Sequence, residues 1–186
     1  TETFGKKTLE RPQRLNLPEG VVRSCSVAPN FLWDNAIYLL GLDAKGNPDR
    51  AAQCFEAARE LHLAILDKAE GNTAAAIRAF FESWRPESAA EHPLVAPCLK
   101  GLLGGGNLVF LGIDTIYAFE DPAVRQAWET YRAEASGGYR AQCLVTGLAD
   151  QPIEVTHPKI KGVRGGQSTG TSLVSFNAPS YWSYGQ

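Results

Sequence analysis

Along the middle of the chain, apolar residues recur at steps of three and four, the spacing that places them on one face of a helix. The pattern predicts a helix over residues 30–41, with Asn30 as its N-cap, and a second helix over residues 48–66. A third helix is predicted from Thr73, its expected cap, to a stop at Pro86. Because the third helix carries an aromatic face, we expect that face to pack against the second helix.

Beyond the three glycines at 104–106, the pattern changes to short apolar runs separated by turn residues, which is typical of antiparallel strands. The predicted strands cover residues 107–111, 115–119, 141–146, 153–156 and 173–176. One helix is expected among them, because Asp121-Pro122 has the form of an N-cap followed by a proline in the first helical position.

These elements predict an α+β fold in which a helical lobe, about residues 30–102, packs with a small, mostly antiparallel β-rich lobe, about residues 107–177. We expect a single domain over 1–186. Its predicted segments are an extended basic segment at 1–29, the helical lobe at 30–102, and the β-rich lobe at 103–186 with a basic glycine-rich loop at 157–171. The abrupt start at Thr1 and the lack of methionine indicate a fragment of a longer chain.

Charge is unevenly distributed along the 186 residues, although the net charge is only −2. Residues 1–23 carry five Lys or Arg against three Asp or Glu, and residues 155–186 carry three against none. The region between them is acidic, with ten cations against seventeen acids. A polyanion site is therefore expected at the basic ends and not across the whole surface.

Four cysteines lack the spacing of a zinc site, and we interpret them as small buried hydrophobes in a reducing cytosol. They are Cys25, Cys54, Cys98 and Cys143. No apolar run is long enough for a membrane span and no signal peptide opens the chain, so the sequence predicts a cytoplasmic protein without a membrane partner. No metal or cofactor is expected.

The stretch from His157 to Asn177 holds three cations and four glycines and no acidic residue. Glycines let backbone N–H groups approach a ligand closely and adopt positive φ, while lysine and arginine attract phosphates. Amide and hydroxyl side chains beside them are able to read base edges. The candidate nucleic-acid contacts are Lys159, Lys161, Arg164, Gln167, Ser168, Thr169 and Asn177. A purely solvated hairpin is the alternative interpretation.

A second basic patch is possible near the start of the chain, and its candidate residues are Lys6, Lys7, Arg11 and Arg14. These side chains are equally compatible with a solvated surface. A nucleotide-binding P-loop is not matched, because Gln167 stands where its second glycine is required. A dinucleotide fingerprint is not matched either, because Asn-Leu-Val follows the three glycines at 104–106 where a further glycine is required.

Catalytic chemistry finds little support in the sequence. Ser168 or Ser172 with His157 as the base would give a serine hydrolase, but no Gly-x-Ser-x-Gly turn surrounds either serine. His62 and His92 are interpreted as packed or hydrogen-bonded residues and not as metal ligands. No catalytic residue is therefore assigned.

The pair Asp34-Asn35 is interpreted as an acidic complement to the dipole of the helix that Asn30 is expected to begin.

Three stretches, 30–41, 142–147 and 157–177, resemble the N-terminal portion of the large subunit of the type I-C CRISPR surveillance complex, the Dvulg subtype of Cascade. The likeness runs in order over most of the chain. Two residues depart from the family's pattern, namely Gly166 in place of alanine and Thr169 in place of serine. Neither change alters the chemistry expected of the loop.

The resemblance implies a non-catalytic subunit that recognises the protospacer-adjacent motif in duplex DNA, helps to open the duplex and holds the displaced strand. In RNA-guided systems base pairing reads the long target, so the protein reads only a short motif and holds backbones. The implied partners are double-stranded target DNA, guide RNA, other Cascade subunits and a helicase-nuclease. An architectural domain that contacts guide RNA or neighbouring subunits is the alternative.

Overall fold

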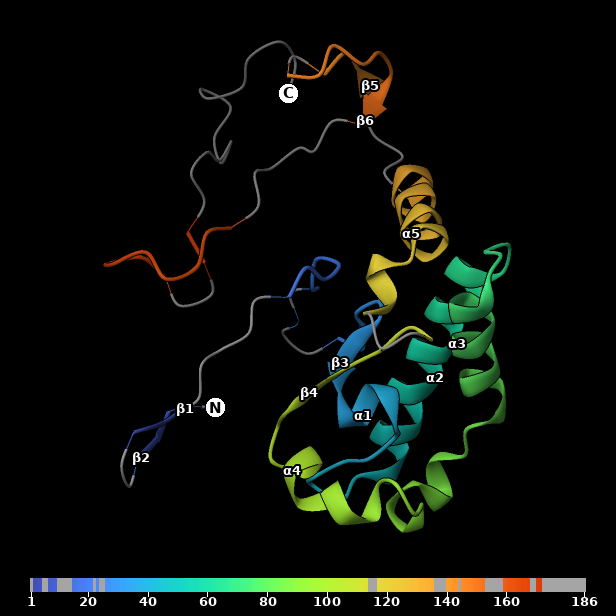
Figure 1. Ribbon diagram of the computed structural model, residues 1–186, viewed down its shortest axis with the longest axis vertical. Coiled ribbons are helices and arrows are strands. Elements are labelled where there is room, and N and C mark those ends of the chain that lie inside the picture. Colours follow the sequence, from blue (N-terminus) through green and yellow to red (C-terminus); the bar gives the residue numbers. More distant parts are fainter. Residues whose placement is uncertain are drawn as a thin grey trace. The chain divides into compact units, whose positions relative to one another are not determined.

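The computed structural model describes residues 2–4, 7–9, 15–21, 23, 26–113, 117–135, 140–143, 145–152, 159–167 and 170–171 (Figure 1). It divides into two units, residues 1–130 and residues 131–186. Helices and two-stranded antiparallel sheets together make an α+β fold, which confirms the fold class expected from the sequence.

Two long antiparallel helices form the body of the first unit, α2 (Pro48–Leu66) and α3 (Asn72–Ser83) (Figure 1). Both were predicted. The Asn47 side chain accepts a hydrogen bond from the Arg50 backbone N–H, and Pro48 occupies the first helical position.

The expected cap of α3 is wrong, because Gly71 occupies the N-cap position and Thr73 lies buried inside the first turn. The predicted packing of the two helices is confirmed, since the Phe55 and Phe81 rings lie 5.9 Å apart.

The helix predicted over residues 30–41 is wrong in its first half. Residues Trp33–Asn35 form strand β3, and only Ala36–Leu39 form a helix, α1. Strand β3 pairs antiparallel with β4 (Asn107–Val109), more than seventy residues away in sequence. The stop at Gly41 is confirmed, because this residue has a φ of +72° directly after the helix.

Short elements connect α3 to β4. They are the 3₁₀ helices η1 (Pro86–Glu91) and η2 (Ala96–Cys98), followed by α4 (Leu99–Leu103). After β4, Leu111 bridges to Tyr117 in the antiparallel sense, which agrees with the hairpin expected there. The second predicted strand of that hairpin does not extend further, because Ala118–Glu120 form a 3₁₀ helix, η3.

Helix α5 (Pro122–Ala135) begins as the sequence predicts. The Asp121 carboxylate accepts hydrogen bonds from the backbone N–H groups of Ala123, at 2.9 Å, and Val124, at 3.4 Å. Val124 is fully buried, and the Trp128 ring stacks on Phe31 with centroids 5.0 Å apart. Through these contacts the first part of α5 belongs to the core of the helical unit.

The core of the first unit gathers aromatic and aliphatic side chains from α1, α2, α3 and the β3–β4 region. The largest buried side chains are Phe31, Phe81, Leu32, Leu66, His62 and Val124. Strand β4, which the sequence assigned to the β-rich lobe, pairs within this unit.

In the second unit, β5 (Arg140–Ala141) pairs antiparallel with β6 (Gln151–Pro152). Among the described residues of the strand predicted over 141–146, only Ala141 lies in a strand, so the prediction is wrong for 142–143 and 145–146. Residues 145–146 lie in a turn closed by hydrogen bonds between Cys143 and Gly147 and between Cys143 and Leu148. The strands predicted at 153–156 and 173–176 lie outside the described residues. The described part of segment 1–29 contains a hairpin of β1 (Glu2–Phe4) and β2 (Lys7–Leu9).

The three cysteines within the described residues are free but not uniformly buried. Cys54 is buried as expected, whereas Cys98 is exposed and Cys143 is half-buried, so the expectation is wrong for these two. Hydrogen bonds from the Thr146 side chain and from nearby backbone N–H groups lower the pKa of the Cys143 thiol. Cys25 lies outside the described residues. Within the part of the chain that is described, no helix is long and apolar enough to cross a membrane.

Candidate nucleic-acid interface

The basic glycine-rich loop is closed by a two-residue antiparallel bridge. Ile160 and Thr171 exchange both backbone N–H···O hydrogen bonds, each 2.9 Å long. Between them two tight turns follow one another, closed by hydrogen bonds from Gly166 to Val163 and from Gly170 to Gln167. The loop is therefore a folded hairpin and not an extended arm.

Three of the four glycines in the loop take up the positive φ that the sequence predicts for them. Their φ values are +78° at Gly162, +82° at Gly165 and +110° at Gly170. Residues with a Cβ rarely adopt this conformation, so these positions favour glycine on backbone grounds alone.

Gly166 and Gly170 also allow close packing inside the loop. A Cβ added at Gly166 would overlap the Thr171 hydroxyl oxygen, and one added at Gly170 would lie 2.7 Å from the Lys159 Cβ. The glycines thus bring backbone into direct contact with side chains of the opposite arm.

The four described candidate contacts, Lys159, Lys161, Arg164 and Gln167, are all exposed. None of them makes an ion pair or a side-chain hydrogen bond with another described residue. The three cations and the amide are therefore presented to solvent from one loop of nine consecutive described residues, which is the chemistry expected of a phosphate contact.

A concavity of about 320 Å³ lies within this loop. Its lining combines the Lys159 and Gln167 side chains with the backbone of Gly165, Gly166 and Gly170, and it includes Thr171. The volume falls at the lower end of the range for small-ligand sites, so the concavity is large enough for a phosphate or a single base.

Thr171 was not predicted as a contact. Its hydroxyl oxygen is buried and has no hydrogen-bond partner among the described residues. Because this oxygen is shielded from solvent, it packs against Gly166 inside the loop. The sequence feature that pointed to Thr171 is the run of hydroxyl residues after Gln167, of which only Ser168 and Thr169 were predicted as contacts.

Several other predicted residues lie outside the described part of the chain. They are Ser168, Thr169 and Asn177 of the loop, Lys6, Arg11 and Arg14 of the second basic patch, and His157 and Ser172 of the hydrolase hypothesis. Lys7 lies in β2, where only the backbone is described. All of these assignments stay predictions. Among the described residues, no group of histidine, cysteine and acidic side chains could hold a metal ion.

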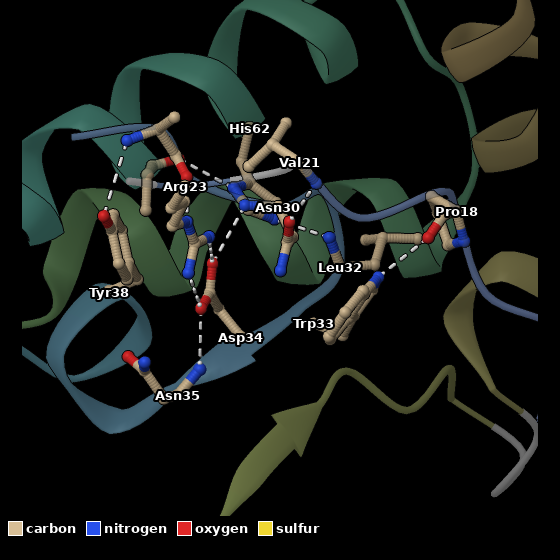
Figure 2. A network of polar contacts seen from close by, with 12 residues as sticks. Pro18, Val21, Arg23, Asn30, Leu32, Trp33, Asp34, Asn35, Tyr38 and His62 are labelled. Atoms are coloured by element: carbon tan, nitrogen blue, oxygen red, sulfur yellow. Dashed lines mark hydrogen bonds and ion pairs between the residues drawn. The ribbon is translucent and has the colours of Figure 1, made fainter. Parts of the chain in front are cut away.

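A buried polar network fixes the segment that precedes the helical body (Figure 2). Both terminal guanidinium nitrogens of Arg23 donate to the carboxylate of Asp34, whose side chain is only 2% exposed. The same carboxylate accepts hydrogen bonds from the backbone N–H groups of Asn30, at 2.9 Å, and Asn35, at 2.8 Å. Asp34 is therefore the anchor of this segment, and its interpretation as a helix-dipole residue is wrong.

Further contacts extend this network in both directions. The Asn30 side chain accepts from the Val21 N–H at 2.8 Å, and the Trp33 indole donates to the Pro18 carbonyl at 2.9 Å (Figure 2). The Arg23 guanidinium also lies 4.1 Å from the centre of the Tyr38 ring. Burial lowers the pKa of Arg23, but the hydrogen bond and charge of Asp34 outweigh it, so the pKa is raised.

His62 occupies the centre of the aromatic core, as the interpretation of this residue as a packed histidine predicted. Its Nε2 accepts from the Leu32 N–H at 2.9 Å, while its Nδ1 lies 2.7 Å from the Ala58 carbonyl and donates to it. Leu32 has a φ of +65°, a strained value that this hydrogen bond helps to hold. Burial lowers the pKa of His62 to about 4, against the opposing effects of Ala58 and Asp34.

His92 is half-buried beside the Trp84 ring and accepts a hydrogen bond from the Leu94 N–H. Its interpretation as a packed or hydrogen-bonded residue agrees with these contacts.

Comparison with known protein families gives the class of the protein. A model of a family described as CRISPR-associated protein matches the chain from residue 1 to residue 186. That family is Cas_Csd1, and the chain belongs to it. The expected likeness to a Cascade-type CRISPR protein is thereby confirmed at the level of the family. A search among curated proteins found no match to this chain.

Proposed function

We propose that the chain is part of the large subunit of a type I-C surveillance complex and recognises the protospacer-adjacent motif in duplex DNA. It helps to open the duplex, holds the displaced strand and performs no catalysis itself. Membership of Cas_Csd1 supports a role beside other Cascade subunits and nucleic acid. The partners in this proposal are duplex target DNA, guide RNA, the other subunits and a helicase-nuclease.

One observation carries the proposal: an acid-free loop exposes three cations and an amide, and it holds a concavity lined by Lys159, Gln167 and glycine backbone. Lys161 and Arg164 contact phosphates, and Lys159 contributes a third positive charge inside the concavity. Gln167 reads a base edge through its amide, which offers one donor side and one acceptor side. Ser168, Thr169 and Asn177 complete the set of contacts.

The phosphate assignment is tested with Lys161→Ala and Arg164→Ala in the assembled complex. Each lost phosphate contact lowers duplex affinity and reduces the slope of log affinity against log salt by about 0.9. Lys45→Ala, which removes an exposed lysine of the helical unit, is the matched control and leaves the slope unchanged. Variants with the wild-type slope would disprove the phosphate contacts.

The variant Gln167→Ala separates recognition of the motif sequence from sequence-independent binding of DNA. The variant loses discrimination among motif sequences by roughly 5- to 150-fold, the range expected for one bidentate base contact, and keeps most non-specific affinity. An unchanged motif preference would exclude Gln167 as the reader.

The architectural alternative makes a different prediction for the same lysines. If the loop contacts guide RNA or a neighbouring subunit, crosslinkers at Lys159 and Lys161 label only RNA or protein and never target DNA. The hydrolase alternative requires that a fluorophosphonate probe label Ser168 or Ser172, so an unlabelled protein excludes it.

A further inference from the structure

The concavity in the basic glycine-rich loop is large enough for a phosphate or a single base, and its lining distinguishes between these two groups. The lining residues are Lys159, Gly165, Gly166, Gln167, Gly170 and Thr171. None of them is aromatic and none is acidic. The concavity therefore presents one positive charge, one amide and glycine backbone to whatever enters it.

A base would find no stacking surface in the concavity. Proteins that hold an unstacked base place it against an aromatic ring or an arginine guanidinium. Arg164 is the one arginine among the described residues of the loop, and it does not line the concavity. The Gln167 amide is able to hydrogen-bond a base edge, but this contact requires no base outside its stack.

The stem of Lys159 lies against Gly170, on the opposite arm of the hairpin. A Cβ added at Gly170 would lie 2.7 Å from the Lys159 Cβ and 3.6 Å from its Cδ. The lysine methylenes thus fill the space that a side chain at position 170 would need. A stem that is already packed loses less rotamer freedom on binding, so the lysine is preorganised for a ligand in the concavity.

Charge identifies the ligand group that suits this lysine. Lys159 is the only cation in the lining, and it makes no ion pair with another described residue. An ammonium carries three N–H donors and binds phosphate as a point charge. Because the stretch from His157 to Asn177 contains no acidic residue, no carboxylate of the loop opposes an anion there.

We propose that the concavity holds one backbone phosphate of the target duplex, bound by the Lys159 ammonium. Lys161 and Arg164, which do not line the concavity, contact other phosphates. This inference rests on the proposed function, since it takes duplex DNA as the ligand. It deepens that function by assigning the chemical group that enters the concavity.

A scan of single uncharged phosphates tests the proposal. Target duplexes with one methylphosphonate linkage, placed in turn at each position in and beside the motif, are titrated with the assembled complex. At one position we expect affinity to fall roughly 10-fold, as for a hydrogen bond to a charged group. With Lys159→Met, the same linkage changes affinity by less than about 3-fold, because its contact is already lost. If no position loses its effect in this variant, the proposal is wrong.

Lys161→Met is the matched control, since it makes the same chemical change on the same arm but outside the concavity. It keeps the roughly 10-fold effect at the position coupled to Lys159 and removes the effect of a different linkage. Methionine at position 159 retains a flexible stem to pack on Gly170, so the loop keeps its fold. Loss of the same linkage effect in both variants would contradict a site built on Lys159.

A parallel scan with single abasic nucleotides tests the other possible guest. If Lys159→Met abolishes the effect of an abasic site instead of a methylphosphonate, the concavity holds a base and the proposal is overturned. The two levels of inference also fail differently. Reduced salt slopes in Lys161→Ala and Arg164→Ala, without any phosphate coupled to Lys159, would overturn this inference alone. Wild-type slopes in all the loop variants would overturn the phosphate contacts of the proposed function with it.

Discussion

His62 links the pH of the solution to the stability of the helical unit. The residue is neutral in the folded protein because burial lowers its pKa to about 4, whereas an unfolded chain binds a proton below about 6.5. The unfolded state therefore binds more protons between these values, and stability falls as the pH falls through this window. The full effect is about 3 kcal/mol.

Urea unfolding at a series of pH values from 7 to 4 measures this effect. The free energy of unfolding decreases toward acid, and His62→Gln, which has no titrating group at this position, shows a smaller slope over the same range. An identical slope in the variant would show that other groups are responsible.

The Arg23–Asp34 pair gives a second prediction at the residue scale. Arg23→Met leaves the nearly fully buried Asp34 carboxylate without its counter-charge, while the hydrogen bonds from Asn30 and Asn35 remain. We expect a loss of about 3 kcal/mol in unfolding free energy, at the low end for a buried pair because Arg23 is itself 23% exposed. Arg59→Met, which breaks a more exposed pair with Glu56, costs about 1 kcal/mol or less in the same assay.

At the scale of elements, Gly41, which directly follows α1, packs closely against Pro86, the first residue of η1. It has a φ of +72°, and an added Cβ would lie 2.5 Å from the Cβ of Pro86. Gly41→Ala therefore combines backbone strain with a steric conflict and costs about 3 kcal/mol. Gly46→Ala is the control, because Gly46 has a φ of +69° and nothing within 4 Å, so only about 1 kcal/mol is lost. Chemical denaturation of both variants checks the difference.

In the basic glycine-rich loop, we expect the effects of substitutions at Gly166 and Thr171 on duplex affinity to depend on each other. In Gly166→Ala the new methyl group conflicts with the Thr171 hydroxyl, and we expect duplex affinity to fall by about 5-fold, equivalent to about 1 kcal/mol. Adding Thr171→Ala frees the space, so the double variant regains most of the affinity lost. Additive losses in a double-mutant cycle would contradict this coupling.

Helices α2, α3 and α5 could be predicted from the sequence because their signals are local: apolar spacing in all three, Pro48 at the start of α2, and Asp121 with Pro122 at the start of α5. Strand β3 could not be predicted in this way. Its residues fit helical spacing, and its partner β4 lies far along the chain. The pairing with β4 decides its structure, and the local sequence around β3 contains no pattern that predicts this pairing.

The same distinction holds for the candidate site. The exposed cations of the loop follow from residue types, and so does the positive φ of three of its four glycines, with Gly166 as the exception. The packing of the Thr171 hydroxyl depends instead on which groups meet after folding. For Cys98, the residue type alone gave a wrong prediction. Cysteine is usually buried, but Cys98 is exposed at the end of η2.

At the scale of the whole molecule, the proposal assigns DNA contact to the second unit and leaves the helical unit to packing and subunit contact. Hydrogen exchange of the assembled complex tests this division. Duplex DNA slows exchange in peptides covering 159–171 and leaves peptides covering α2 unchanged, because the α2 amides are already protected by its helical hydrogen bonds. Protection confined to α2 or α3 would contradict the assignment.

The contact between Gly166 and Thr171 also restricts the history of this loop. With alanine at position 166, threonine at position 171 would be crowded, at the cost of about 1 kcal/mol expected for Gly166→Ala. A change from alanine to glycine at position 166 that came before a change to threonine at position 171 would avoid this cost, so the contact favours one order of substitution over the other.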